Sequence, residues 1–243
     1  MLLSKKNIAE FNDDVRSNDG YLYTTNPPLS SIFANDRISH AVNTHIGTHK
    51  SLVDIGCGDG VYTGEIKKKF PDLEIEGFDP AEDAIALAQK KYPDITFRAM
   101  NILDKDLGQS TRRRFEVGVL RGVLHHLSDQ ELAIRNSFAI ADRIIIVEPN
   151  GNNPILKIIE KVSPYHRLHE EQSFTYWQLK NWVEEAGGNV VFGGYVGFVP
   201  FFFPEFPSKV IRFFQPVLEK IPLVREFFSA QIVIVGTKNS AHS

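Results

Sequence analysis

The sequence predicts an α/β fold with a mostly parallel, doubly wound sheet, and three observations carry this prediction. Short apolar runs alternate with helical segments along most of the chain, which is typical of consecutive strand–helix–strand units. A glycine-rich turn at residues 56–60 follows the first apolar run. An aspartate, Asp79, closes the second run. With 243 residues, the chain is long enough for one such domain with additions.

Seven strands are predicted from apolar or β-branched runs that are bounded by turn residues. They span residues 51–55, 73–78, 95–99, 115–120, 143–147, 189–196 and 231–235. Helices are predicted between the strands from the spacing of their apolar and alanine residues. They span residues 61–70, 81–91, 129–141, 154–162 and 176–186.

Two segments lie outside this alternating pattern. Residues 1–48 are polar and turn-rich, so we expect an N-terminal extension or lid ahead of a main domain at residues 49–243. Residues 198–228 contain nine phenylalanines and five prolines. We expect this second segment to form a helical cap that packs on the core and walls a binding pocket. A dimer contact and a contact with a membrane surface are the alternatives.

Bulk properties exclude several classes of protein. The net charge is −3, so no global attraction to nucleic acid is expected. Cys57 is the one cysteine, so no internal disulfide can form. The N-terminus lacks the apolar core of a signal peptide, and no stretch approaches the roughly 20 apolar residues of a transmembrane helix. We therefore expect a cytoplasmic protein.

The glycine-rich turn predicts a site for a nucleotide-like ligand. Gly56, Gly58 and Gly60 permit positive φ angles and let a ligand approach the backbone closely. The following helix directs its first N–H groups at this space, which favours a negative group. A dinucleotide site would have its third glycine at position 61, where this chain has Val61. The spacing therefore argues against NAD binding.

Asp79 strengthens the prediction of a nucleotide-like ligand. It lies 19 residues after Gly60, at the end of the second predicted strand. A carboxylate at this place can accept both hydroxyls of a ribose. Capping of the helix at residues 81–91 is the alternative, and the two roles are compatible.

These residues resemble the class I S-adenosylmethionine (SAM) dependent methyltransferases, in the branch that acts on small molecules. Leu52–Gly60 is similar to the first motif of the family, and Glu76–Asp79 to its acidic second-strand end. Phe115–Leu127 and Ile144–Asn150 resemble the fourth and fifth strands with their following loops. The resemblance implies a seven-stranded Rossmann-like sheet whose last strand is antiparallel, with SAM as the cofactor.

The resemblance also implies roles for individual residues. The loop residues would surround the methionine part of SAM, Asp79 would hold the ribose, and the next positions would lie beside the ribose and adenine. The fourth strand would end facing the cofactor, although arginine is unusual there in the family. In order along the chain, the implied cofactor-binding residues are Asp54, Gly56, Cys57, Gly58, Asp79, Pro80, Asn101, Ile102 and Arg121.

Histidines supply candidates for a general base. Methyl transfer to a hydroxyl benefits from a base, and histidine is the commonest choice. His125 follows the fourth predicted strand, at the carboxyl edge where ligands bind in such sheets. His166 and His169 lie three residues apart in the loop region after the fifth strand. A packing role for His125 and an exposed charged loop at residues 165–171 are the alternatives. No convincing set of metal ligands is present in the sequence.

The sequence therefore predicts a SAM-dependent methyltransferase with a small-molecule acceptor, such as a sugar, a polyketide-like metabolite or a lipid-linked compound. Transfer to oxygen is favoured over transfer to nitrogen or carbon. A non-catalytic SAM-binding module and an NAD(P)-dependent reductase are the alternatives. The sequence leaves open whether the chain forms a homodimer, and we expect no nucleic-acid partner.

Overall fold

The computed structural model describes residues 12–13, 15–16, 20–25, 27–111, 113–162, 172–201 and 203–239, with only the backbone at residues 22, 23 and 162. Its centre is one seven-stranded sheet in the order β3-β2-β1-β4-β5-β7-β6. β7 pairs antiparallel with β5 and with β6, and the remaining neighbours pair parallel. The predicted sheet with an antiparallel last strand is confirmed. The strands are β1 (Ser51–Ile55), β2 (Glu74–Asp79), β3 (Thr96–Ala99), β4 (Phe115–Arg121), β5 (Ala141–Pro149), β6 (Gly188–Val196) and β7 (Gln231–Lys238).

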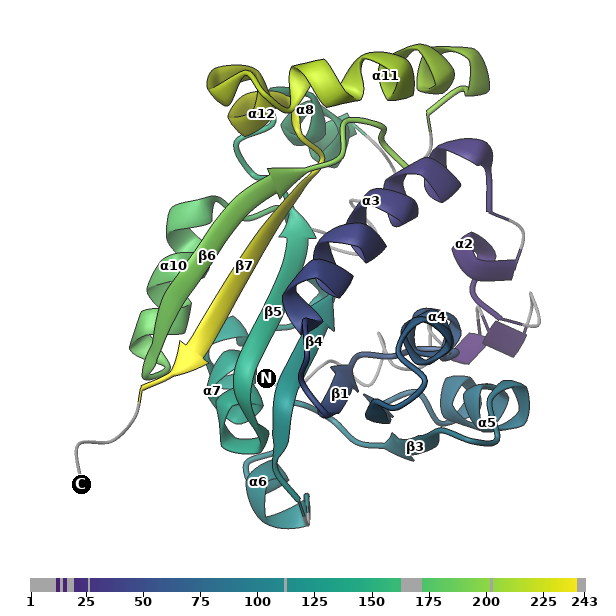
Figure 1. The fold of residues 1–243 in the computed structure, drawn as a ribbon, viewed down its shortest axis with the longest axis vertical. Helices are drawn as coiled ribbons and strands as arrows, with labels where there is room; N and C mark the ends of the chain where they lie inside the picture. The colour runs from purple at the N-terminus through teal and green to yellow at the C-terminus, as the bar shows by residue number, and fades with distance from the viewer. Residues whose placement is uncertain are drawn as a thin grey trace.

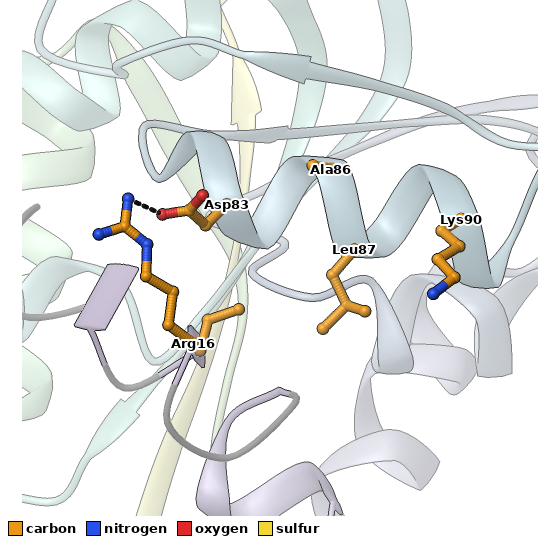
Figure 2. Close-up of a pocket in the computed structure, with 6 residues that line it drawn as sticks. Arg16, Asp83, Ala86, Leu87 and Lys90 are labelled. Carbon is orange, nitrogen blue, oxygen red and sulfur yellow. Dashed lines mark ion pairs between the residues drawn. The ribbon is translucent and has the colours of Figure 1, made fainter.

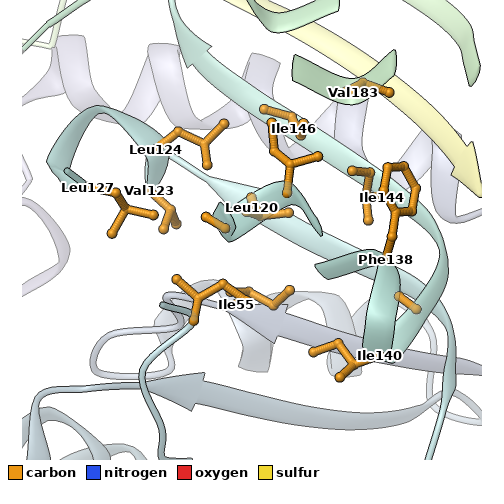
Figure 3. Close-up of a cluster of buried hydrophobic side chains, with 14 of the residues drawn as sticks. Ile55, Leu120, Val123, Leu124, Leu127, Phe138, Ile140, Ile144, Ile146 and Val183 are labelled. Carbon is orange, nitrogen blue, oxygen red and sulfur yellow. The ribbon is translucent and has the colours of Figure 1, made fainter. Parts of the chain in front are cut away.

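Helices cover both faces of the sheet (Figure 1). Side chains of α3 (Leu29–Ile46), α4 (Val61–Lys69) and α5 (Glu82–Lys91) form one buried cluster with the sheet. Side chains of α6 (Leu107–Ser110), α7 (Gln130–Ile140) and α10 (Tyr176–Glu185) form the other. Figure 3 shows this second cluster, in which Ile55, Leu120 and Ile146 from three strands lie together. Parallel strands buried on both faces explain the continuous apolar runs in the sequence.

Local signals explain where the helices begin and end. Thr175 and Gln178 form a reciprocal capping box at the start of α10. Asp129 accepts a hydrogen bond from the Leu132 N–H at 2.9 Å and so caps α7. The predicted helix over residues 129–141 ends one residue earlier, because Ala141 pairs with Phe115 and begins β5.

The N-terminal region contains both a structural helix and a covering segment. α3 buries Ile38, Val42 and Ile46 in the cluster that it shares with α4, α5 and one face of the sheet, so this helix is part of the packed fold. The short helix α2 (Leu22–Thr25) precedes it. The described residues of this region before α3, among them Val15, Arg16, Tyr21 and Thr24, lie instead over the glycine-rich turn and α5, as the contacts below show.

The remaining helices gather beyond the carboxyl ends of the central strands. They are α8 (Pro154–Val162), α11 (Glu205–Leu218) and α12 (Pro222–Phe228), and Figure 1 shows them together at the top of the view. The helical structure expected within residues 198–228 is present in α11 and α12. Over the described ranges, no helix is sufficiently long and apolar to cross a membrane.

Candidate cofactor and active site

The turn after β1 requires glycine at two positions. Gly56 and Gly58 have φ angles of 76° and 54°, in the left-handed region that favours glycine. A Cβ atom on Gly56 would lie 2.5 Å from Cγ2 of Val123, in the loop after β4. The turn is also tied to β2, because the N–H groups of Gly56 and Cys57 donate to the carbonyl of Phe78 at 2.7 and 3.1 Å. The turn therefore sits at the junction of β1, β2 and β4.

Replacing Gly58 with alanine tests how tightly the N-terminal segment covers this turn. A Cβ atom on Gly58 would lie 2.6 Å from Cε2 of Tyr21. We expect Gly58→Ala to lose about 1–2 kcal/mol from the left-handed backbone alone, and more because the Tyr21 ring must move. The matched control is Gly187→Ala, where φ is 83° and no atom lies within 4 Å of the added Cβ. Urea denaturation measures both variants, and equal losses would contradict the contact with Tyr21.

Asp79 fastens the turn to the end of β2. Its two carboxylate oxygens accept hydrogen bonds from the Gly58 N–H at 2.9 Å and the Ala81 N–H at 2.8 Å. Burial raises the pKa of Asp79 to about 6, although these two N–H groups act to lower it. Each oxygen keeps a further lone pair, so the carboxylate can still accept two hydroxyl groups. The helix-capping alternative is also satisfied through the contact with Ala81.

Two more buried carboxylates lie beside the turn. Asp54 accepts a hydrogen bond from the Thr63 hydroxyl at 2.5 Å, and burial raises the pKa of Asp54. Asp59 accepts from the Thr24 hydroxyl at 2.8 Å and lies 3.2 Å from the Lys91 ammonium. The negative charges of Asp54 and Asp59 also raise the pKa of Asp79, so the three carboxylates interact electrostatically. This cluster favours a ligand that carries positive charge.

The N-terminal segment is held across the turn and α5 by several contacts. Val15 and Tyr21 pack with Ala81, Ala84 and Leu87 of the α5 region. Figure 2 shows Arg16 reaching Asp83 on α5, with the guanidinium nitrogen 2.8 Å from the carboxylate. The hollow in that figure lies on the outer side of α5 and contains no candidate catalytic group. Thr24 and Tyr21 of this segment therefore lie against Asp59 and Gly58 of the turn.

The predicted adenine-side residues lie near the end of β2. Pro80 follows Asp79 directly, and Asn101 and Ile102 follow the neighbouring strand β3. The Met100 N–H donates to the Asp79 carbonyl at 3.0 Å, which places Asn101 next to the end of β2. The Asn101 side-chain oxygen accepts from the Leu103 N–H at 3.0 Å, so its amide group is held in a turn. Ile102 is buried in the core cluster, whereas Pro80 is half-buried at the surface.

Arg121 ends β4 but directs its guanidinium towards α3 and α4. It donates to the side chains of Asn35 at 2.8 Å and Ser39 at 3.0 Å. The guanidinium also lies 3.6 Å from the centre of the Tyr62 ring, a cation–π contact. Burial lowers the pKa of Arg121. Asn35, Ser39 and Tyr62 line a hollow beside the N-terminus of α4, so Arg121 lies behind this hollow and contacts residues of its wall.

His125 forms a pair with a buried glutamate that the sequence analysis did not select as a site residue. Its Nδ1 atom lies 2.7 Å from Oε2 of Glu148, which is fully buried at the end of β5. The other oxygen of Glu148 accepts from the Val123 and Leu124 N–H groups at 2.9 and 2.7 Å. One carboxylate therefore shapes the loop after β4 and orients the imidazole. A charged residue directly after the apolar run Ile144–Val147 of β5 is the sequence signal that could have found it.

The other two histidine candidates, His166 and His169, lie outside the described residues. Their suggested role therefore stays a prediction. Among the residues that the structure describes, no group of three or more His, Cys, Asp or Glu side chains is placed to hold a metal ion. Cys57 is buried, and burial raises the pKa of its thiol well above the usual value, so its placement fits a small loop residue.

The site combines three features: backbone N–H groups at the start of α4, a carboxylate that can accept hydroxyl groups, and a histidine that can act as a base. The cap residue Gly60 offers no side chain to the start of α4, and the first N–H, that of Val61, donates to Asp59 at 3.5 Å. The next N–H groups of the first turn can bind a negative group. Asp79 offers acceptors for a ribose, and Asp54, Asp59 and Asp79 favour a cation. His125 and Glu148 form a carboxylate–imidazole pair of the kind that accepts a proton.

Comparisons with known proteins agree with this geometry. Residues 53–142 match a family described as a methyltransferase domain. The chain is 35% identical over 68 residues to trans-aconitate 2-methyltransferase of Acidovorax sp. (strain JS42), covering 28% of this chain and 24% of that protein. It is 30% identical over 113 residues to dTDP-3-amino-3,6-dideoxy-alpha-D-glucopyranose N,N-dimethyltransferase of Streptomyces fradiae, covering 44% of this chain and 42% of that protein. The matches thus span less than two thirds of either relative.

Solved structures resemble the whole chain. A SAM-dependent methyltransferase from Thermotoga maritima, described as a possible histamine N-methyltransferase, has a TM-score of 0.65 at 17% identity, covering 94% of this chain and 98% of that one. Magnesium protoporphyrin IX methyltransferase from Synechocystis PCC 6803, solved with bound SAH, has a TM-score of 0.62 at 14% identity, covering 93% and 94%. At these identities the likeness shows a shared fold.

Proposed function

We propose that this chain, which carries a methyltransferase domain of the class I fold, transfers a methyl group from SAM to a hydroxyl of a small molecule. The observation that carries the proposal is the carboxylate cluster around the glycine-rich turn, with Asp79 holding Gly58 at 2.9 Å. SAM bears a sulfonium and an ammonium group, which three neighbouring carboxylates favour. A dinucleotide site would have its third glycine at position 61, where this chain has Val61.

The residues present fit SAM part by part. Asp79 would accept the ribose hydroxyls, and the first N–H groups of α4 would receive the methionine carboxylate. Asp54 and the backbone of Gly56 would lie near its charged atoms, and Arg121 would close the wall towards α3. Pro80, Asn101 and Ile102 would border the adenine. When bound, SAM supplies an electrophilic methyl group on a positively charged sulfur.

This chain's own residues would supply the proton transfer. The acceptor hydroxyl must lose its proton as the new bond forms, and His125 is the described group best placed to take it. Glu148 would keep the His125 proton on Nδ1, so that Nε2 is the basic atom. The closed N-terminal segment would exclude water from the reacting groups. A positioned base of this kind contributes roughly 10²–10⁴-fold to a rate.

Two measurements test the proposed function. Calorimetric titration with SAM and with NADH should show binding of SAM only. Incubation with methyl-labelled SAM and a metabolite extract should then transfer label to a small molecule, whose structure gives the acceptor atom. Binding of SAM without transfer to any fraction would instead support a non-catalytic SAM-binding module.

The names of the relatives do not agree on the acceptor or on the atom that is methylated. One is named for trans-aconitate and the other for the amino group of a nucleotide-linked sugar. We favour oxygen as the methylated atom because the His125–Glu148 pair provides a base, which a neutral amine needs less. A labelled product with the methyl group on nitrogen would overturn this part of the proposal.

The pair His166 and His169 is a second candidate for the base or for acceptor binding. If either residue acts in this way, the double variant His166→Ala, His169→Ala should lower turnover at least about tenfold and leave SAM affinity unchanged. The measurement is steady-state transfer of labelled methyl groups to the identified acceptor. Unchanged turnover would remove both residues from the site and leave His125 as the base.

A further inference from the structure

We propose that the helices α8, α11 and α12 bind the interfacial region of an anionic membrane. Their outward-facing side chains form one surface, which we call the outer apolar face. It consists of Ile155, Ile158, Phe206, Val210, Phe213, Phe214, Val217, Ile221, Leu223, Phe227 and Phe228, all of them exposed. The inference goes beyond methyl transfer, because it concerns where the protein works.

α11 is oriented opposite to an ordinary surface helix. Its only buried residues are Ser208 and Gln215, which face the protein. Phe206 and Phe213 are each 77% exposed, and Val217 is 60% exposed. These three positions are spaced by seven and four residues and so share one helical face. A helix that turns its polar side inward and its aromatic side outward has no apolar partner within the described part of the chain, which marks an interaction surface.

Polar contacts fix α11 in this orientation. Arg212 pairs with Asp36, and Glu219, just after α11, pairs with Arg37, so both contacts join the helix region to α3. Gln215 donates to the Glu219 carboxylate at 2.9 Å. The apolar side of α11 is therefore held outward by specific pairs, and rotation of the helix would break them.

α12 and α8 continue the outer apolar face. α12 has no buried residue, and Leu223 is 69% exposed. Ile158 on α8 is 61% exposed, and α8 and α12 contact one another. In Figure 1 the three helices lie at the same end of the molecule. The face is therefore shared by neighbouring helices and is broader than one stripe.

The charges around this face select an anionic membrane as its partner. Over α8, α11, α12 and the α11–α12 linker, six basic residues stand against four acidic ones. The exposed ones are Lys161, Lys209, Lys220 and Arg225 against Glu205. The chain as a whole has a net charge of −3, so this local excess of positive charge is distinctive. Exposed phenylalanines bordered by Lys and Arg are the pattern of helices that lie in the membrane interface. α11 has 14 residues, too few to cross a bilayer.

The outer apolar face is tied to the candidate site. The Asn150 amide donates to the carbonyls of Glu226 and Ser229 at 2.8 and 2.9 Å, which joins α12 to the end of β5. Glu148 lies two residues before Asn150. A docked molecule would therefore hold the carboxyl edge of the sheet close to the membrane surface. Among the acceptors considered, this favours a lipid-linked hydroxyl compound, a step that rests on the proposed function.

Vesicle co-sedimentation tests the docking itself and requires neither SAM nor an acceptor. The full chain should pellet with vesicles of phosphatidylglycerol and phosphatidylcholine, and at least fivefold less with phosphatidylcholine alone. The double variant Phe206→Ser, Phe213→Ser should lower the bound fraction at least tenfold. The matched control is Val191→Ser, which changes a 53% exposed side chain on β6 and should bind like the parent chain. Circular dichroism confirms that the variants are folded.

Two results would overturn the proposal. One is a parent chain that stays in the supernatant with both kinds of vesicle. The other is a parent dimer in light scattering that the serine pair converts to a monomer, with no vesicle binding, because the outer apolar face would then cover a second copy. Neither result affects SAM titration or label transfer, so failure of the docking proposal is separable from failure of the proposed function.

Discussion

Replacing Asp79 with asparagine should raise the Kd for SAM about 100-fold. The carboxylate would accept two ribose hydroxyls, and hydrogen bonds to a charged group contribute roughly 1.5–3 kcal/mol each. Asparagine offers one acceptor oxygen, which the Gly58 and Ala81 N–H groups already require at 2.9 and 2.8 Å. A loss of about 3 kcal/mol corresponds to about 100-fold in Kd. Isothermal titration calorimetry at pH 7.5 measures the change.

The same residue should make SAM binding depend on pH. Burial raises the pKa of Asp79 to about 6 in the chain without cofactor, and SAM binds the ionised form. Binding therefore lowers the pKa of Asp79. The affinity is fully present above pH 6 and weakens as the pH falls through 6, by up to about tenfold per pH unit. Asp79→Asn should remove this dependence.

Asp83→Asn is the matched control for Asp79→Asn. It makes the same chemical change four residues further on, at a carboxylate that pairs with Arg16 on the outer side of α5. We expect its Kd for SAM to stay within about threefold of the parent value, since surface pairs contribute little. If the Kd of Asp79→Asn for SAM also stayed within threefold of the parent value, Asp79 would only hold the turn in place, and the ribose would bind elsewhere.

The sheet and the turn could be predicted from the sequence because their signals are local. The residues of β1 are buried apart from its first one, so a continuous apolar run identified this strand. Gly58 has a φ of 54°, and a glycine at this place in the sequence already indicates a turn with a positive φ angle. The link between Gly58 and Asp79 could be anticipated because the fold brings the carboxyl ends of β1 and β2 together.

Other parts of the site could not be predicted because they depend on contacts distant in sequence. Glu148 meets His125 across 23 positions, and only the pairing of β4 with β5 brings them to 2.7 Å. Arg121 could be placed at a strand end, but its turn towards Asn35 depends on how α3 packs. The apolar side of α11 was expected on the core. It faces outward, while Arg212 and Glu219 pair with residues of α3.

Replacing Glu148 with glutamine should lower kcat about 10²–10⁴-fold while the fold and the Kd for SAM are retained. The glutamine oxygen can accept from the Val123 and Leu124 N–H groups, as one oxygen of Glu148 does at 2.9 and 2.7 Å. The amide nitrogen would then face Nδ1 of His125, which must become an acceptor. The proton moves to Nε2, the atom that has to take the hydroxyl proton. Single-turnover transfer of labelled methyl groups to the identified acceptor measures the loss.

A double-mutant cycle separates this positioning role from a purely structural one. If Glu148 acts through His125, Glu148→Gln should cost little further rate in a His125→Ala background, because the two residues work as a unit. If Glu148 only shaped the loop after β4, the two losses would multiply. His125 would then have a packing role, and the proton would leave through another group.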